Sequence, residues 1–274
     1  MKKIVVIGLG IIGGSISAAL TKAGYHVDGT DLKKENVEYA KKRGYIADAA
    51  ADISLYDVVF IAVPPKATIS ILNNTTFKTG ALVCDICGVK EEIEKAVYAV
   101  KRNFRYVGIH PMAGKETSGI EYASPTLFAM ANLVITVSEH TNPKWIEEVK
   151  EYAAAMKFGK IVECSAKEHD KKIALTSQLA HIVANAYVKS PEVIGCYGFT
   201  GGSFQDMTRI AGVDEKIWTE LYLSNKEYIL DELDVLIENL SKYRKAIEKE
   251  DAETLANTLK EGRLIRETIR YKRD

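Results

Sequence analysis

Three segments of the sequence carry side chains that could bind and react with a small molecule. In the first, His110 stands at the end of a predicted strand, Tyr106–Ile109, with Pro111 beside it and glycines on both sides. A neutral imidazole could accept a proton there, since the unperturbed pKa of histidine is about 6.5. A lone histidine is more often structural, but its place at a strand end gives the catalytic interpretation equal weight.

The other two segments contain a second imidazole and a guanidinium. His181 lies on an otherwise apolar predicted helix, where the simplest interpretation is a buried, hydrogen-bonded side chain. Arg209 follows a glycine-rich break and is flanked by Met207 and Ile210, so we expect its guanidinium to be partly buried. A buried guanidinium normally needs a carboxylate partner, which the protein or a substrate could supply.

A glycine-rich turn near the start of the chain predicts a dinucleotide site. The predicted strand Ile4–Ile7 leads directly into the pattern G-x-G-x-x-G. Gly8 permits a tight turn, Gly10 lets backbone N–H groups approach a pyrophosphate, and Gly13 lets the next helix pack closely on the strand. The helix N-terminus adds partial positive charge. The residues expected around the cofactor phosphates are Gly8, Leu9, Gly10, Ile11, Ile12 and Gly13.

An acidic residue completes this pattern about 18 positions further on. Asp31 follows the predicted second strand and could accept hydrogen bonds from the adenosine ribose hydroxyls. A carboxylate there would repel a 2′-phosphate, which favours NAD, although Lys33 and Lys34 leave NADP possible. Val63 and Pro64 follow the third predicted strand and are expected to flank one of the cofactor riboses.

The elements that must position these residues alternate along the first half of the chain. Short apolar runs separated by helical patterns predict a parallel sheet with helices on both faces. The predicted strands are Ile4–Ile7, His26–Thr30, Asp57–Ala62, Ala81–Asp85, Tyr106–Ile109, Leu133–Val137 and Lys160–Glu163, and helices are expected over Gly13–Lys22 and Lys34–Arg43.

The pattern becomes entirely helical from about residue 166. Glu168–Lys189 has helical spacing, a break follows over Ser190–Phe204, and Glu227–Lys249 carries an apolar stripe that predicts a core face or a dimer interface. We therefore predict an N-terminal Rossmann-type α/β domain that binds NAD, residues 1–165. An all-α domain for substrate binding and dimerisation, residues 166–274, should follow.

Composition narrows the class of protein. The 37 basic and 37 acidic side chains balance, so no nucleic-acid surface is expected. No apolar run reaches the 18 or so residues that span a bilayer, and the immediate start of a strand leaves no room for a signal peptide. We expect a cytoplasmic protein whose four cysteines are reduced, and no metal site. His26, His140 and His169 are assigned structural or solvated roles.

Taken together, these motifs resemble the prephenate/arogenate dehydrogenase family. The resemblance rests on His110-Pro111-Met112-Ala113-Gly114, on the helix carrying Ser177 to His181, and on Gly202 through Ala211 leading to Trp218. It covers essentially the whole chain and matches the compact, monofunctional form, without a fused mutase or regulatory domain.

The resemblance implies an NAD-dependent oxidative decarboxylation of prephenate to 4-hydroxyphenylpyruvate in tyrosine biosynthesis. Arogenate, which would give tyrosine directly, is the alternative substrate; a β-hydroxyacid dehydrogenase or a non-catalytic NAD-binding protein is a weaker one. His110 would be the base, and Arg209 and His181 would bind the substrate carboxylates. Glu116 would form a gating ion pair at the mouth of the site, unless it is simply an exposed loop residue. A homodimer is implied.

Two positions depart from the family pattern. The family often has serine where this chain has Gly88, so a hydroxyl near the substrate is missing or is replaced by water or by Cys87. Gln205 stands where many members have a basic residue, which could alter the preference between prephenate and arogenate. Lys90 persists and could contact cofactor or substrate, or pair with Glu91 or Glu94.

Overall fold

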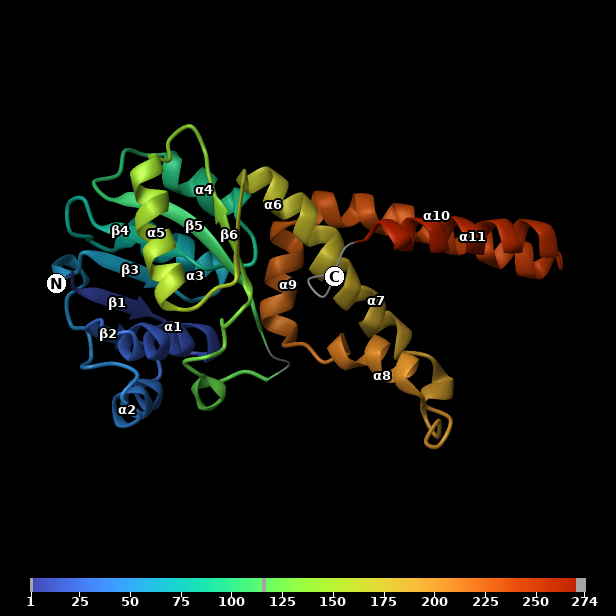
Figure 1. Ribbon diagram of the computed structural model, residues 1–274, viewed down its shortest axis with the longest axis horizontal. Coiled ribbons are helices and arrows are strands. Elements are labelled where there is room, and N and C mark those ends of the chain that lie inside the picture. Colours follow the sequence, from blue (N-terminus) through green and yellow to red (C-terminus); the bar gives the residue numbers. More distant parts are fainter. Residues whose placement is uncertain (1, 115–116, 270–274) are drawn as a thin grey trace. The chain divides into compact units, whose positions relative to one another are not determined.

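The computed structural model describes residues 2–114 and 117–269 (Figure 1). The chain forms two compact units, the first extending to Asn225 and the second beginning at Lys226. The domain boundary predicted after residue 165 is a different kind of division, and it stays a prediction.

The first unit is built around a seven-stranded sheet with the strand order β2-β1-β3-β4-β5-β6-β7. The strands are β1 Ile4–Ile7, β2 Val27–Thr30, β3 Val58–Ile61, β4 Leu82–Asp85, β5 Arg105–Met112, β6 Asn132–Thr136 and β7 Lys160–Cys164. The helices between them are α1 Ile11–Lys22, α2 Lys34–Lys42, α3 Pro65–Asn74, α4 Glu91–Tyr98 and α5 Pro143–Ala155. The predicted α/β order is therefore confirmed.

One strand pair departs from the parallel arrangement. Strand β5 pairs in parallel with β4 up to Gly108 and then antiparallel with β6, where His110 lies opposite Val134. The strand predicted to end at Ile109 therefore continues to Met112, and His110 lies within it. Pro111 is compatible with this position because the β4 neighbour has already ended, so one side of the strand needs no backbone donor.

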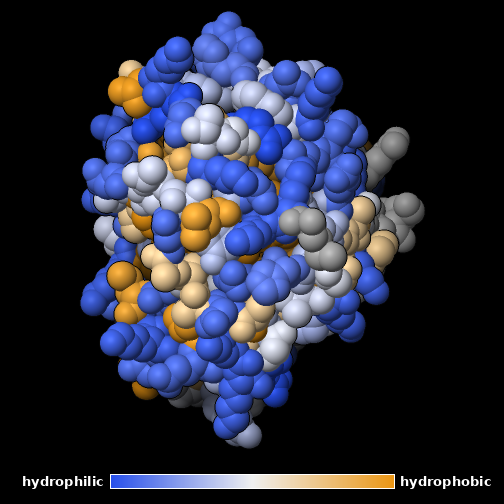
Figure 2. All heavy atoms as spheres, turned by 90° about the vertical axis from the view of Figure 1, so that its left-hand side faces the viewer, coloured by the Kyte–Doolittle hydropathy of each residue, from blue (hydrophilic) through white to orange (hydrophobic). Residues whose placement is uncertain are grey.

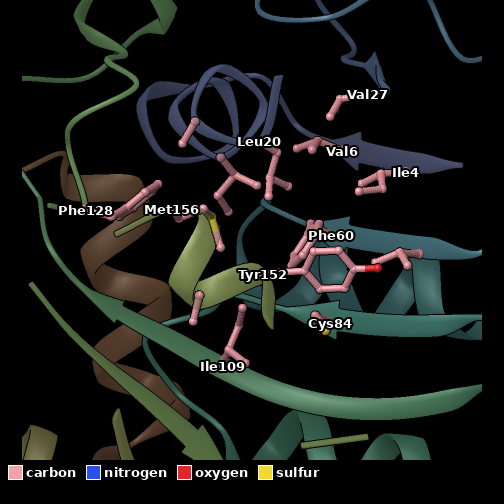
Figure 3. Packing of buried hydrophobic residues seen from close by; sticks show 14 of the residues in the cluster. Ile4, Val6, Leu20, Val27, Phe60, Cys84, Ile109, Phe128, Tyr152 and Met156 are labelled. Carbon is pink, nitrogen blue, oxygen red and sulfur yellow. The ribbon is translucent and has the colours of Figure 1, made fainter. Parts of the chain in front are cut away.

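The sheet is buried on both faces because its strands alternate apolar side chains between two helical layers. Val6, Phe60 and Ile109 point to the layer of α1, α2 and α5, whereas Val5 and Val83 point to α3 and α4. Figure 3 shows part of the first layer, in which Phe60 meets Tyr152 edge to face with ring centroids 5.9 Å apart. This packing fixes the ends of the strands, where the site lies.

A long helix leads out of the sheet. It consists of α6 (Ala166–Ile173), a π-helical segment (Ala174–Leu179) and α7 (Ala180–Tyr187), which confirms the helix predicted over Glu168–Lys189. Helix α8 spans Gly202–Thr208, so it begins inside the break predicted over Ser190–Phe204, and α9 spans Glu215–Ser224.

The second unit is a pair of helices, α10 (Lys226–Glu248) and α11 (Ala252–Thr268). Several apolar side chains of these helices are exposed: Leu230, Val235, Ile237, Leu240, Ile247, Leu259, Leu264 and Ile265. The predicted stripe is thus only partly covered within one chain. By contrast, the face of the molecule in Figure 2 carries hydrophobic residues mainly in small separate groups. Among residues 2–114 and 117–269, no helix is both long and apolar enough to span a bilayer.

Candidate active site

The glycine turn has the geometry that its sequence predicts. Gly8 has a φ of +92°, which a side chain would strain, and a Cβ there would also overlap the carbonyl oxygen of Ala62. A Cβ at Gly13 would overlap the carbonyl oxygen of Gly8, so glycine lets α1 pack directly against the strand end. At Gly10 a Cβ would meet no described atom within 4 Å. The turn is therefore tightly packed against the protein at Gly8 and Gly13, whereas no described atom covers it at Gly10.

The residue at the end of β2 is tied to this turn. The Asp31 carboxylate accepts hydrogen bonds from the backbone N–H of Leu9 at 2.7 Å and of Lys33 at 2.8 Å. Each carboxylate oxygen has more than one acceptor position, so both can still receive ribose hydroxyls. Helix α1 begins with Gly10 as its N-cap and with no side-chain cap, which leaves its first N–H groups for an anion. The residues fit an NAD cofactor, and their contacts with it stay a prediction.

Short contacts connect this turn to the next strand ends. Val63 lies against Gly8, and its carbonyl oxygen is 3.3 Å from the Sγ of Cys87. The same thiol is 3.3 Å from Oγ1 of Thr68 in α3, and burial raises the pKa of Cys87 to about 12. The thiol is thus held against α3 and stays protonated at neutral pH.

His110 faces the position where the family often has serine. A Cβ at Gly88 would lie 3.8 Å from both Nε2 and Cε1 of His110, so glycine leaves space beside Nε2. The other ring nitrogen, Nδ1, is 2.9 Å from Nε2 of His169. Burial, together with His169 and Lys90 nearby, lowers the pKa of His110 well below its ordinary 6.5. The imidazole is therefore neutral at neutral pH and able to accept a proton.

His169 is the main residue that the sequence interpretation missed, because the structure buries it. Its side chain is 1% exposed, and its Nδ1 lies 2.6 Å from Oδ1 of Asp170. The sequence predicted a structural or solvated role for His169, and the prediction that it is solvated is wrong. A signal existed: Ala166, His169 and Ile173 share one face of the helix, and the two apolar neighbours mark that face as buried.

Lys90 does not pair with either glutamate considered from the sequence. Its Nζ lies 2.6 Å from Oδ1 of Asp85, and both side chains are fully buried. Asp85 also accepts hydrogen bonds from the Tyr106 hydroxyl at 2.7 Å and the Cys87 N–H at 3.0 Å. Asp85 ends β4 and Lys90 returns across the turn that follows, which is why residues five apart in sequence meet. This pair neutralises a buried charge at the floor of the site.

Helix α9 joins this region to the second predicted imidazole. A Cβ at Gly88 would lie 3.6 Å from Leu221 of α9, and Trp218 of the same helix packs against His181 with ring centroids 4.0 Å apart and ring planes tilted by 46°. Residues three apart in a helix lie on one face. His110 and His181 therefore border the same face of α9.

His181 borders a cleft of about 750 Å³. Its Nδ1 is 2.8 Å from the carbonyl oxygen of Ile210, and because a carbonyl only accepts, Nδ1 must carry the hydrogen. Nε2 is then an acceptor in the neutral ring and a donor to a carboxylate only in the imidazolium. The cleft is lined by Gly114, Thr117, Ser118, His181, Ile210, Gly212, Val213, Asp214, Ile217 and Trp218.

Two predicted substrate residues, Arg209 and Gln205, are not among the residues that line this cleft. Arg209 is exposed, which contradicts the partly buried guanidinium expected from the sequence, because it begins a short 3₁₀ turn after α8, a helix with no buried residue. Its neighbour Ile210 lines the cleft instead. Gln205 is also exposed on α8. Glu116 lies outside the described residues.

Models of known protein families match most of this chain. Residues 16–162 match the model of the prephenate dehydrogenase nucleotide-binding domain, and residues 165–261 match that of the prephenate dehydrogenase dimerization domain.

Individual relatives agree. The prephenate dehydrogenase of Bacillus subtilis is 32% identical over 97% of this chain and 76% of its own. The cyclohexadienyl dehydrogenase of Zymomonas mobilis is 30% identical over 100% of this chain and 98% of its own. A crystal structure of Aquifex aeolicus prephenate dehydrogenase with hydroxyphenyl propionate and NAD+ superposes with a TM-score of 0.85 and 28% identity, covering 98% of this chain and 99% of the other. The chain therefore belongs to the prephenate dehydrogenase family.

Proposed function

We propose that this protein is an NAD-dependent prephenate dehydrogenase that converts prephenate to 4-hydroxyphenylpyruvate and CO2. The observation that carries the proposal, beside the family, is the neutral His110 ring with its Nε2 next to the space at Gly88. A base in that position suits a substrate whose reacting carbon bears a hydroxyl group.

The chain's own residues would supply orientation and proton transfer. When bound, NAD+ accepts the hydride from the hydroxyl-bearing ring carbon. His110 Nε2 takes the hydroxyl proton as that hydride leaves, and loss of the ring carboxylate as CO2 makes the ring aromatic. The imidazolium can return its proton to the phenolate oxygen, so no net proton is released. Because aromatisation drives the reaction, the protein's main task is to hold the substrate in hydride-transfer geometry.

The cofactor would lie over the carboxyl ends of β1 and β2. The open face of Gly10 and the uncapped start of α1 suit a pyrophosphate, and Asp31 suits ribose hydroxyls. A carboxylate at that point repels a 2′-phosphate, so we propose NAD as the preferred cofactor and NADP as a poor one. Val63, packed on Gly8, and the exposed Pro64 would flank the cofactor.

The decisive experiment measures NADH or NADPH formation by the purified protein with prephenate and with arogenate, each with NAD and NADP. The highest kcat/KM should be found with prephenate and NAD. Failure to turn over either substrate with either cofactor would show that the proposal is wrong. A higher kcat/KM with arogenate would assign the second candidate.

Arogenate is kept as that second candidate because of one contact. Since His181 donates from Nδ1 to Ile210, its neutral ring offers only an acceptor at Nε2. Arogenate has an ammonium group where prephenate has a keto oxygen. A neutral His181 could accept a hydrogen bond from that ammonium but could not donate one to the keto acid.

Arg209 is proposed to bind a substrate carboxylate, and its substitution gives a direct test. Arg209→Ala should raise KM for prephenate by roughly tenfold to a hundredfold with little change in kcat, because a charge-assisted hydrogen bond is lost in ground and transition states alike. Arg263→Ala, which removes an exposed α11 arginine paired with Glu267, is the matched control. An unchanged KM in Arg209→Ala would remove Arg209 from the binding site.

The functional form is proposed to be a homodimer. Ile194, Tyr197 and Phe199 are 90%, 96% and 92% exposed, and they lie in the part of the chain that matches the dimerization domain. Exposed aromatic side chains in a group are typical of an interface. Sedimentation equilibrium should give the mass of two chains, and Tyr197→Ser with Phe199→Ser should shift it toward one. A monomeric wild-type protein would contradict the proposal.

A further inference from the structure

We infer that His169 is a positioning residue for the reaction proposed above: with Asp170 it fixes the tautomer of His110, so that Nε2 of His110 is the nitrogen without a hydrogen. The inference rests on the proposed role of His110 as the base. It concerns a residue that contacts Nδ1 of His110, the ring nitrogen other than the Nε2 that lies beside Gly88.

Asp170 is a residue of α6, and its carboxylate lies at the N-terminus of α4. Its Oδ1 and Oδ2 accept hydrogen bonds of 2.8 Å from the backbone N–H groups of Lys90 and Glu91, and its side chain is 1% exposed. Both carboxylate oxygens therefore accept hydrogen bonds from backbone N–H groups, and neither is left to donate toward His169.

The next step is His169, whose Nδ1 lies 2.6 Å from that carboxylate. Because the carboxylate only accepts, Nδ1 must carry a hydrogen. Burial lowers the pKa of His169 below its ordinary 6.5, although the Asp170 contact opposes this, so the ring is neutral at neutral pH. A neutral ring has a single N–H, and Nε2 of His169 is therefore an acceptor.

The last step is the contact of 2.9 Å between His169 Nε2 and His110 Nδ1. Since one nitrogen of a hydrogen bond must donate, Nδ1 of His110 carries the hydrogen. The lone pair of a neutral His110 is then on Nε2, beside the space at Gly88. The opposite tautomer would place two lone pairs against each other at Nδ1 and leave no acceptor for the substrate hydroxyl.

The same hydrogen bonds, from His110 to His169 and from His169 to Asp170, also stabilise the protonated base. When Nε2 of His110 takes a proton, the imidazolium still donates from Nδ1 to His169, which in turn donates to the Asp170 carboxylate. The positive charge is thus connected to a negative one through a polarised ring. Lys90 is the other cation near both rings, and its pairing with Asp85 reduces its repulsion.

Two variants separate this role from simple filling of space. His169→Leu keeps a similar volume but removes the acceptor for His110. His169→Gln puts an amide oxygen about where Nε2 lies, so it keeps the acceptor and loses the link to Asp170. His26→Gln, at a histidine that is about half exposed on its side chain, is the control for the substitution itself.

The first measurement needs no substrate. Nitrogen NMR of protein labelled in the rings of its five histidines reports which nitrogen of each carries the hydrogen, and His110→Asn identifies the His110 signals. Wild-type His110 should carry its hydrogen on Nδ1. His169→Leu should show a mixture of tautomers, and His169→Gln should keep the wild-type form.

The second measurement is steady-state turnover. His169→Leu should lower kcat by about tenfold to a hundredfold, while KM for prephenate and NAD stays within about a factor of two. His169→Gln should recover part of that loss, and His26→Gln should match wild type.

The results decide the inference in either direction. A wild-type His110 that carries its hydrogen on Nε2 would overturn it, and so would a folded His169→Leu variant with wild-type kcat. If His169→Leu does not fold, loss of the Nδ1–H tautomer in His169→Gln would overturn it. Failure of wild type to turn over prephenate or arogenate would instead contradict the proposed function and leave the NMR result standing.

Discussion

His110→Asn should lower kcat by about 10²- to 10⁴-fold while KM for prephenate changes little. Asparagine can place an amide N–H about where Nδ1 of His110 lies, so it can still donate to His169, which is 2.9 Å from that nitrogen. Asparagine has no atom in the position of Nε2. The fall in kcat therefore measures the contribution of the general base alone, which is typically of this size. Steady-state kinetics at neutral pH measures both constants.

The pH dependence of kcat/KM in wild type and in His110→Asn gives a second test of the same role. Because burial, His169 and Lys90 lower the pKa of His110 well below 6.5, wild-type kcat/KM should stay level through neutral pH. It should fall only on the acid side, when the base becomes protonated, and this acid limb should be absent from His110→Asn. His140→Asn, a change at a histidine with a half-exposed side chain, should leave the wild-type profile intact. A variant at His110 with near wild-type kcat would exclude it as the base.

Gly13→Ala should weaken NAD binding by about a hundredfold and lower the free energy of unfolding by about 2–4 kcal/mol. The new methyl group would overlap the carbonyl oxygen of Gly8, so α1 must move away from the end of β1. That movement displaces the helix N-terminus from the pyrophosphate position. Calorimetric titration with NAD and chemical denaturation measure the two effects.

Two further glycines make this prediction specific. Gly10→Ala meets no described atom within 4 Å, so it should fold with wild-type stability and lose affinity only because its methyl group faces the cofactor. Gly262→Ala in α11 should bind NAD normally and be slightly more stable, since alanine favours a helix by about 1 kcal/mol. If Gly13→Ala kept both stability and affinity, close packing would not be the reason for glycine at this position.

The first half of the fold could be predicted because its signals are local. The fully buried strands Ile4–Ile7 and Val58–Ile61 are continuous apolar runs, and the glycines at positions 8 and 13 report backbone conformation and close approach directly. What could not be predicted is the direction of β6, since antiparallel pairing with β5 depends on a partner strand and not on either segment alone. The same pairing explains why His110 lies inside a strand.

The candidate site was predictable only in part for the same reason. His110 follows a recognisable apolar run, whereas His169 lies among Lys167, Glu168 and Lys171, a sequence that is typical of a solvated helix. Its burial results from packing between α6 and the sheet, which is a tertiary effect. The prediction for Arg209 was wrong in the opposite direction. Its apolar neighbours at helical spacing predicted a partly buried guanidinium, but the short helix α8 before it has no buried residue.

The π-helical segment Ala174–Leu179 has a geometric consequence for the two imidazoles on either side of it. In a regular α-helix, with about 100° of rotation per residue, positions twelve apart such as 169 and 181 would point about 120° away from each other. A π turn accommodates one extra residue, so the effective separation is eleven and the angle falls to about 20°. The widened turn thus corrects the rotational phase of the helix, and a single rod can present both His169 and His181 in the same direction.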